Sequence, residues 1–211
     1  TNQDGVKEKV RARLTLSEMQ KFIDQYNVPS MVSLSARLTN LAEVKHGSQK
    51  TNPNVDIRGA NEEYIPIKGL NIQEGRNFSR FEVQRGSNVA VIGYKLAQAL
   101  YGDIPMPVGT SISFKGTQFK VIGMLKEKGD FSDNNYDNMV IVPILVANQL
   151  AAGQPLNYRL NVGISDMNQL DYAMGEATGL MRKIRQDRVE DANSFEIEKS
   201  ESLAEEMESI T

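Results

Sequence analysis

The feature that most constrains this chain is a glycine-punctuated series of short apolar runs in its middle, residues 85–148. Val89–Ile92 is fully apolar and is followed at once by Gly93, which is typical of a buried strand. Gly109–Lys126 alternates between apolar and polar residues on both sides of a Lys-Gly-Thr turn, which predicts a hairpin. Val140–Val142 adds a further strand. We therefore expect a short, self-contained and β-rich block over these residues.

The segments on either side of this block combine helices with strands. Thr15 and Glu18 form a capping box, and apolar residues then recur at helical spacing until Pro29. Met31–Glu43 and, after the block, Arg159–Ile164 alternate like strands. A second helix is predicted by an apolar stripe of Leu170, Ala173, Met174, Ala177, Leu180, Met181 and Ile184. Both outer segments thus indicate an α/β layer.

Several shorter elements complete this interpretation. Val55–Gly59, after an Asn-Pro-Asn turn, predicts a short strand, and Leu96–Tyr101 predicts a short helix. Residues 66–86 contain several glycines and are expected to be mostly loop. Phe195 and Ile197 are expected to form a closing strand.

These elements together predict an α+β fold with two lobes. One lobe is discontinuous and α/β, built from residues 1–84 and 149–211. The other is the β-rich block of residues 85–148, which is inserted into the first lobe. The chain length of 211 residues suffices for a full hydrophobic core in such an arrangement.

Both ends of the chain carry helical patterns. Ser202 and Glu205 form a capping box, and the apolar residues that follow it recur at helical spacing up to the last residues. The N-terminal pattern of Val6, Val10 and Leu14 fits either an incoming helix or a strand. Because the first residue is Thr1 and the last helix has no C-cap, we expect the chain to be part of a longer protein.

Composition excludes several classes of function. The formal net charge is -3, so the chain lacks the excess of basic residues that a nucleic-acid-binding surface needs. It has no cysteine, which excludes disulfides, thiolate catalysis and cysteine-ligated metals. The longest apolar run, Met139–Ala147, is far shorter than the roughly 20 residues that span a bilayer.

Three stretches invite a chemical interpretation, and each has a simpler one. The sequence VAVIGYKLAQAL places one glycine between a strand and a helix, but it lacks the further glycines of a phosphate-binding loop, which favours ordinary strand-to-helix packing. Asp130, Asp133 and Asp137 offer oxygen ligands for Ca²⁺ without the glycine and glutamate of an EF-hand, which favours a polar loop. His46 has no partner at ligand or catalytic spacing. No catalytic motif occurs, so we expect no enzymatic activity, cofactor or metal.

An ordered set of short motifs resembles one known family. These motifs are Gly75-Arg76-x-Phe78, Val89-Ala90-Val91-Ile92-Gly93, Ala97-x-x-Leu100-Tyr101-Gly102, Pro107-x-Gly109, Phe119-x-Val121-Ile122-Gly123 and Val142-Pro143. In this order and spacing they resemble the extracytoplasmic domain of MacB-like and FtsX-like ABC transporter permeases.

The resemblance implies an architecture and a role for the motif residues. Family domains have a discontinuous porter-like lobe and an inserted sabre-like lobe, which correspond here to residues 1–84 with 149–211 and to residues 85–148. The stretch NIQEGRNFSRFEVQRGSNVAVIG would then cross between the lobes, with Arg76 and Phe78 fixing the joint. A strand that usually precedes the first helix has only the charged residues before Leu14 to form it.

The resemblance also implies a function and partners. The domain would lie on the periplasmic face of the inner membrane, tethered to it by flanking helices, and would pass motion from ATP hydrolysis on a separate domain or subunit into the periplasm. Expected partners are the cognate ATPase, a second copy in a homodimer or pseudo-dimer and, for drug or peptide efflux, a membrane fusion protein and an outer-membrane channel. Lipoprotein release, regulation of a cell-wall hydrolase and a stand-alone secreted binding module remain open as alternatives.

Overall fold

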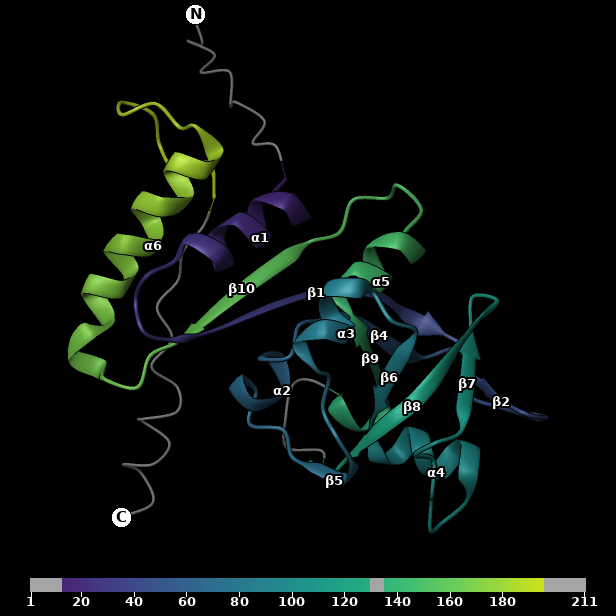
Figure 1. The fold of residues 1–211 in the computed structure, drawn as a ribbon. Helices are drawn as coiled ribbons and strands as arrows, with labels where there is room; N and C mark the ends of the chain where they lie inside the picture. The colour runs from purple at the N-terminus through teal and green to yellow at the C-terminus, as the bar shows by residue number, and fades with distance from the viewer. Residues whose placement is uncertain (1–12, 130–134, 196–211) are drawn as a thin grey trace, which may run out of the picture. The chain divides into compact units, whose positions relative to one another are not determined.

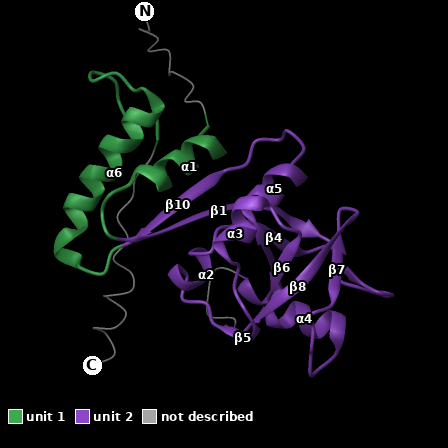
Figure 2. Ribbon diagram, in the orientation of Figure 1, with its two compact units in different colours: residues 1–29, 164–211 green, residues 30–163 purple. Residues whose placement is uncertain are grey.

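The computed structural model describes residues 13–129 and 135–195 (Figure 1). Its chain divides into two compact units (Figure 2). The first unit contains residues 1–29 and 164–211, and the second contains residues 30–163. We call them the terminal unit and the central unit.

One mixed sheet organises the central unit. Within the described residues it has ten strands, in the order β10-β1-β4-β9-β6-β8-β7-β2-β3, with β5 paired to β8. Neighbouring strands are antiparallel except for the parallel pairs β4–β9 and β6–β8. The strands are β1 Met31–Ala42, β2 Lys45–His46, β3 Gln49–Lys50, β4 Val55–Ala60, β5 Ile72–Gly75, β6 Val89–Ile92, β7 Ser111–Phe114, β8 Thr117–Leu125, β9 Met139–Pro143 and β10 Tyr158–Gly163.

Short helices connect these strands, and longer ones form the terminal unit. Helices α1 and α6 belong to the terminal unit, and the other α-helices belong to the central unit (Figure 2). Their bounds are α1 Leu16–Gln25, α2 Tyr64–Ile67, α3 Arg80–Arg85, α4 Tyr94–Tyr101, α5 Ile144–Leu150 and α6 Leu170–Arg185, with 3₁₀ turns η1 Tyr136–Asn138 and η2 Met167–Gln169.

The elements predicted from periodicity are present where they were expected. The capping box of Thr15 and Glu18 starts α1, because each side chain accepts a hydrogen bond from the backbone N–H of the other residue. The predicted hairpin is β7 and β8, which turn at Lys115 and Gly116. The predicted closing strand and the terminal helical patterns extend into residues 1–12 and 196–211, which lie outside the described part of the chain.

One expectation differs from the structure, and the predicted lobes, which stay a prediction, are divided differently from the compact units. Residues 66–86, expected to be mostly loop, contain the end of α2, all of β5 and α3. The expected lobe borders at 84/85 and 148/149 also differ from the borders between the compact units, which lie at 29/30 and 163/164. The reason is the parallel pairing of β4 with β9, which joins a strand from before residue 85 to one from the expected insert in a single sheet.

The two faces of strands β10, β1 and β4 have different chemistry. Helix α5 covers one face, where Ala147 lies so close to Gly59 that a Cβ on the glycine would come within 2.5 Å of the alanine Cβ. Leu34, Ala36 and Ile57 alternate onto this face and are buried, so it is apolar. The opposite face carries serines, arginines and Asp56, and the short helix α2 packs on it.

Candidate functional site

The structure brings several of the motif residues together where β5 ends. Gly75, Arg76 and Gly109 line a groove of about 380 Å³ beside β8, within the central unit, and Gly123 pairs with Gly75 in the adjoining ladder. The lining residues of the groove are Gly75, Arg76, Val108, Gly109, Lys120, Val121 and Ile122. We call the connection from β5 to α3, together with the groove beside it, the β5–α3 turn. It is the candidate site that the sequence motifs predict.

Close backbone contact explains the glycines of the turn. Gly75 has φ +77°, and a Cβ there would lie 2.1 Å from the carbonyl oxygen of Ile122. On the facing strand, a Cβ on Gly123 would lie 2.4 Å from the carbonyl oxygen of Arg76. The backbone N–H of Arg76 donates to the Ile122 carbonyl at 2.9 Å. Two strands therefore approach at a distance that only glycine permits.

A bidentate ion pair between Arg76 and Glu82 also stabilises this turn. Arg76 donates from Nη1 and Nη2 to the two carboxylate oxygens of Glu82 at 2.6 and 3.1 Å. Glu82 is also the third residue of α3, where it forms a capping box with Ser79. The hydrogen bonds from Arg76, followed by those from Ser79, lower the pKa of the Glu82 carboxyl to about 2, although burial acts in the opposite direction.

Phe78 anchors the turn to the core. Its side chain is buried. Its backbone N–H donates to Asn77 Oδ1 at 2.7 Å, and Asn77 Nδ2 donates to the carbonyl of Glu62 at 2.8 Å. The turn is thus fixed by a buried ring, a side-chain amide and an ion pair, which suits a rigid structural element.

The remaining motif residues lie elsewhere in the central unit. Gly93 precedes α4, and a Cβ on it would lie 2.3 Å from the carbonyl oxygen of Tyr136 in η1. Gly102 follows α4, with φ +93°. Pro143 ends β9 and precedes α5. These residues shape individual strand–helix connections and do not join the β5–α3 turn.

The polar candidates from the sequence are occupied by structural hydrogen bonds. Asp137 accepts from the backbone N–H groups of Lys128 and Gly129 at 2.8 and 3.0 Å, while Asp130 and Asp133 lie outside the described residues. His46 Nδ1 lies 2.8 Å from the carbonyl oxygen of Ser111, which requires the proton on Nδ1. In residues 13–129 and 135–195, no group of three His, Asp or Glu side chains is arranged to hold a metal ion.

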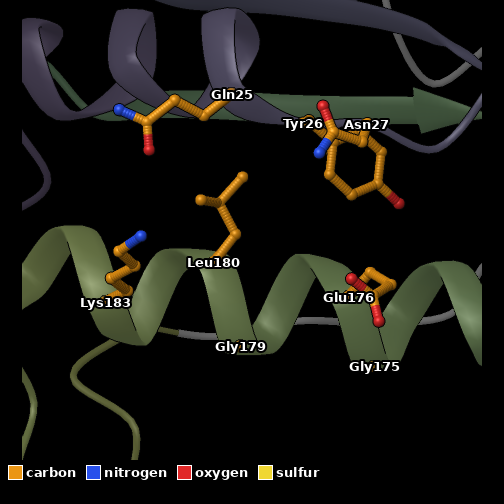
Figure 3. A pocket seen from close by; sticks show the side chains of 8 residues that line it. All are labelled: Gln25, Tyr26, Asn27, Gly175, Glu176, Gly179, Leu180 and Lys183. Atoms are coloured by element: carbon orange, nitrogen blue, oxygen red, sulfur yellow. The ribbon is translucent and has the colours of Figure 1, made fainter.

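The terminal unit has a groove of its own. It has a volume of about 550 Å³ between the end of α1 and the middle of α6 (Figure 3). Tyr26 contributes its ring and donates its hydroxyl hydrogen to the carbonyl of Ala173 at 2.8 Å. Burial, and then the nearby Glu176 and Tyr172, raise the pKa of Tyr26. Among the described residues, neither groove is lined by a nucleophile paired with a base.

Sequence reasoning missed part of the β5–α3 turn. Glu82, Asn77 and Lys120 were not among the predicted site residues. The Ser79-x-x-Glu82 pattern is the same capping box that predicted α1, and it was the available signal for α3. Lys120 reaches the groove only because β8 pairs with β5 and β7, which periodicity does not reveal.

The comparisons with known proteins agree with this architecture. The periplasmic region of MacB from Actinobacillus actinomycetemcomitans aligns with 100% of this chain and 90% of its own at a TM-score of 0.69 and 17% identity. The extracellular domain of YknZ from Gram-positive bacteria covers 88% of this chain and 89% of its own, with a TM-score of 0.68 and 19% identity. These likenesses show the fold.

Relatives in sequence are longer proteins. The macrolide export ATP-binding/permease protein MacB of Bdellovibrio bacteriovorus is 26% identical over 174 residues, which are 82% of this chain and 26% of that protein. The pyoverdine export ATP-binding/permease protein PvdT of Pseudomonas savastanoi pv. phaseolicola is 33% identical over 129 residues, which are 60% of this chain and 20% of that protein. The chain thus spans about a quarter or less of the length of these relatives.

The family itself is shown by a direct match. Among the described residues, no helix is both long enough and apolar enough to cross a membrane. The family model described as the MacB-like periplasmic core domain matches residues 2–180, which is most of the chain. The chain therefore belongs to the MacB-like periplasmic core domains, the extracytoplasmic part of an inner-membrane ABC transporter permease.

Proposed function

We propose that this domain transmits ATP-driven motion across the inner membrane to periplasmic partners and thereby supports efflux of drugs, peptides or similar substrates. In this proposal, helices flanking the domain tether it to the bilayer, and ATP is hydrolysed by a cytoplasmic domain or subunit. Two copies, or two related domains, face each other in the intact transporter. A membrane fusion protein and an outer-membrane channel are its proposed partners.

The path of the chain through the two units is the observation that carries this proposal. The residues before 30 and after 163 both belong to the terminal unit. Only two connections lead from it to the central unit, at 29/30 and 163/164. The residues next to them, Met31 and Gly163, are partners in the antiparallel ladder of β1 and β10. Motion that enters through both tethers would therefore reach the central unit at a single pair of strands.

Contacts inside the terminal unit support its action as one rigid body. Arg185 of α6 donates from Nη1 to Glu18 Oε1 of α1 at 2.8 Å. Further along the two helices, the Tyr26 hydroxyl donates to the Ala173 carbonyl. Because the two helices that follow and precede the tethers are bonded to each other, a pull on either one is shared by both. In the central unit, the fixed β5–α3 turn, with Arg76 and Phe78, would similarly resist deformation.

The names of the relatives support export over the alternatives. MacB and PvdT are described as export proteins for macrolides and for pyoverdine, respectively. These substrates differ widely, so the class of cargo is proposed only as exported small molecules or peptides. Lipoprotein release and regulation of a cell-wall hydrolase have no comparable support among these relatives.

A distance measurement between two copies in the full-length transporter tests the proposal. The chain has no cysteine, so Gln49→Cys on β3 and Lys183→Cys on α6 each introduce one labelling site in this domain. Both positions are exposed. With spin labels on the reconstituted transporter and its ATPase, we expect the inter-copy distance distribution to differ between nucleotide-free and ATP-bound states for both labels.

A transporter with an ATPase that binds but does not hydrolyse ATP is the matched control, and it should remain in one of the two distributions. The same distribution in every nucleotide state, for both labels, would contradict the proposal. A change for Lys183→Cys alone would restrict the motion to the terminal unit.

A further inference from the structure

The face of the sheet opposite α5 concentrates positive charge. On β1, β4 and β10 the side chains alternate between faces, and Arg37 lies across from Arg58 while Ser35 lies across from Arg159. Gly163 shares this face with Arg159. A Cβ placed on Gly163 would lie 3.7 Å from the Ile67 side chain. Helix α2 therefore packs on the arginine face, and Lys68, the residue directly after α2, joins the same cluster.

Acidic groups neutralise only part of this charge. Asp56 lies 3.0 Å from Arg37 Nη2 and 3.5 Å from Arg58 Nε. Within residues 13–129 and 135–195, no carboxylate forms an ion pair with Lys68 or Arg159. A further cation, Lys128, lies next to Lys68, because its Nζ donates to the backbone carbonyl of Lys68 at 3.3 Å. The face thus carries a local excess of positive charge although the whole chain is acidic.

The cluster is preorganised by the groups around it. The Tyr64 ring, which is fully buried, lies 6.0 Å from Lys68 Nζ, and its hydroxyl accepts from Arg58 Nη1 at 3.4 Å. No hydrogen bond among the described residues uses Arg58 Nη2. Burial, followed by the charges of Arg58 and Arg159, lowers the pKa of Lys68, as expected where like charges converge without a counter-ion.

We propose that Arg58, Lys68 and Arg159 form a binding site for a phosphate group, carried either by a soluble phosphate ester or by a phospholipid headgroup. Phosphate suits the site better than a single carboxylate, because its charge and its several acceptor oxygens match two guanidinium groups and one ammonium. Arg58 and Arg159 stand two strand spacings apart, roughly 10 Å, and two residues apart along the strands, roughly 7 Å, so about 12 Å separates their backbone positions and their long side chains can approach one anion from two sides. Lys68 supplies a third donor from α2.

Titration of the 211-residue chain with inorganic phosphate tests the site. Phosphate is added at constant ionic strength, with chloride as the compensating anion, and the amide signals of β1, β4 and β10 are followed by NMR. We expect saturable shifts confined to these strands and α2. The double variant Lys68→Gln, Arg159→Gln should weaken binding roughly tenfold or more, because it removes two of the three charged donors.

The matched control removes two positive charges elsewhere. Lys21→Gln, Lys50→Gln lies on exposed positions of α1 and β3, so it lowers the net charge equally and should leave binding within twofold of the parent chain. Thermal unfolding of both double variants verifies that each is folded. Equal weakening by the two double variants would overturn the proposal, since it would show a general charge effect.

Vesicles distinguish the two sources of phosphate. Co-sedimentation with phosphatidylglycerol vesicles, but not with phosphatidylcholine vesicles, that is lost in Lys68→Gln, Arg159→Gln would support a headgroup. Binding of inorganic phosphate without vesicle binding would support a soluble ester. No saturable binding to either probe, or tighter binding to a polyglutamate peptide than to phosphate, would overturn the site. The inter-copy distance experiment is independent of this result.

Discussion

Two arginine–glutamate pairs, one in each unit, use the same local motif for different purposes. In both, the glutamate is the third residue of a helix and closes a capping box, Glu18 with Thr15 and Glu82 with Ser79. Glu82 binds Arg76, six residues away, whereas Glu18 binds Arg185, which is 167 residues away on another helix. One pair closes a turn, and the other joins two elements from opposite ends of the chain.

The surroundings decide what each pair contributes. The Arg185 side chain is 7% exposed, whereas the Arg76 side chain is 56% exposed. Water can therefore replace Glu82 around Arg76, but not Glu18 around Arg185. At the β5–α3 turn, the close backbone contact of Gly75 and Gly123 fixes the position of the backbone, and the ion pair adds further stability. In the terminal unit the side-chain pair joins α1 to α6, together with the bond from the Tyr26 hydroxyl to the Ala173 carbonyl.

The largest effect is expected from Gly123→Ala. The added Cβ would lie 2.4 Å from the backbone carbonyl oxygen of Arg76, so β5 or β8 must move, at a cost of roughly 3–5 kcal/mol of unfolding free energy. Urea unfolding measures it. The control Gly179→Ala, in the middle of α6 with open space around it, should instead stabilise by about 0.5–1 kcal/mol. A similar result for both variants would show that the backbone contact does not fix the turn.

Glu18→Gln should have the next largest effect. Glutamine preserves the capping box, so the variant removes only the charge that pairs with Arg185. Because Arg185 stays almost fully buried, we expect a loss of about 2–3 kcal/mol in unfolding free energy. Thermal and urea unfolding provide the measurement. A loss below about 0.5 kcal/mol would mean that the remaining bonds of Arg185, to Ser194 Oγ and the Arg13 carbonyl, are sufficient.

Glu82→Gln is the matched variant in the central unit and should cost less, about 1 kcal/mol at pH 7, because Arg76 is exposed and water screens the pair. The pKa of Glu82 is lowered from 4.5 to about 2 in the folded chain, so this contribution is present above the ordinary pKa. It is lost as the pH falls from about 4.5 to about 2. Unfolding curves of the parent and the variant should therefore converge over this range. A gap that persists at pH 2 would assign the effect to something other than the ion pair.

Local patterns were readable from the sequence, and long-range pairings were not. The box at Thr15 predicted α1, and the alternation of Gly109–Lys126 predicted β7 and β8. The parallel pairing of β4 with β9 leaves no trace in either strand, since both are short and the pattern within a strand does not identify its partner. This is why the predicted borders at 84/85 and 148/149 differ from the borders between compact units.

The candidate site was predictable only in part, for the same reason. Gly75 and Gly123 entered through the family motifs, but their contact depends on the pairing of β5 with β8. The phosphate site proposed for Arg58, Lys68 and Arg159 had no sequence signal, because its residues come from three elements separated by many residues. Charges that are scattered along a chain show no pattern until the register of the strands is known.

The pairing of Met31 with Gly163 gives the link between the two units a directional mechanical strength. Forces that spread the two connecting segments apart would open the ladder as a zipper opens, breaking the bonds one after another from this end. Forces that draw both segments in the same direction would move β1 and β10 together and would instead load the pairing of β1 with β4 in shear, across several hydrogen bonds at once. The link would thus open readily when its two segments are pulled apart and would resist a force that acts on both segments in the same direction.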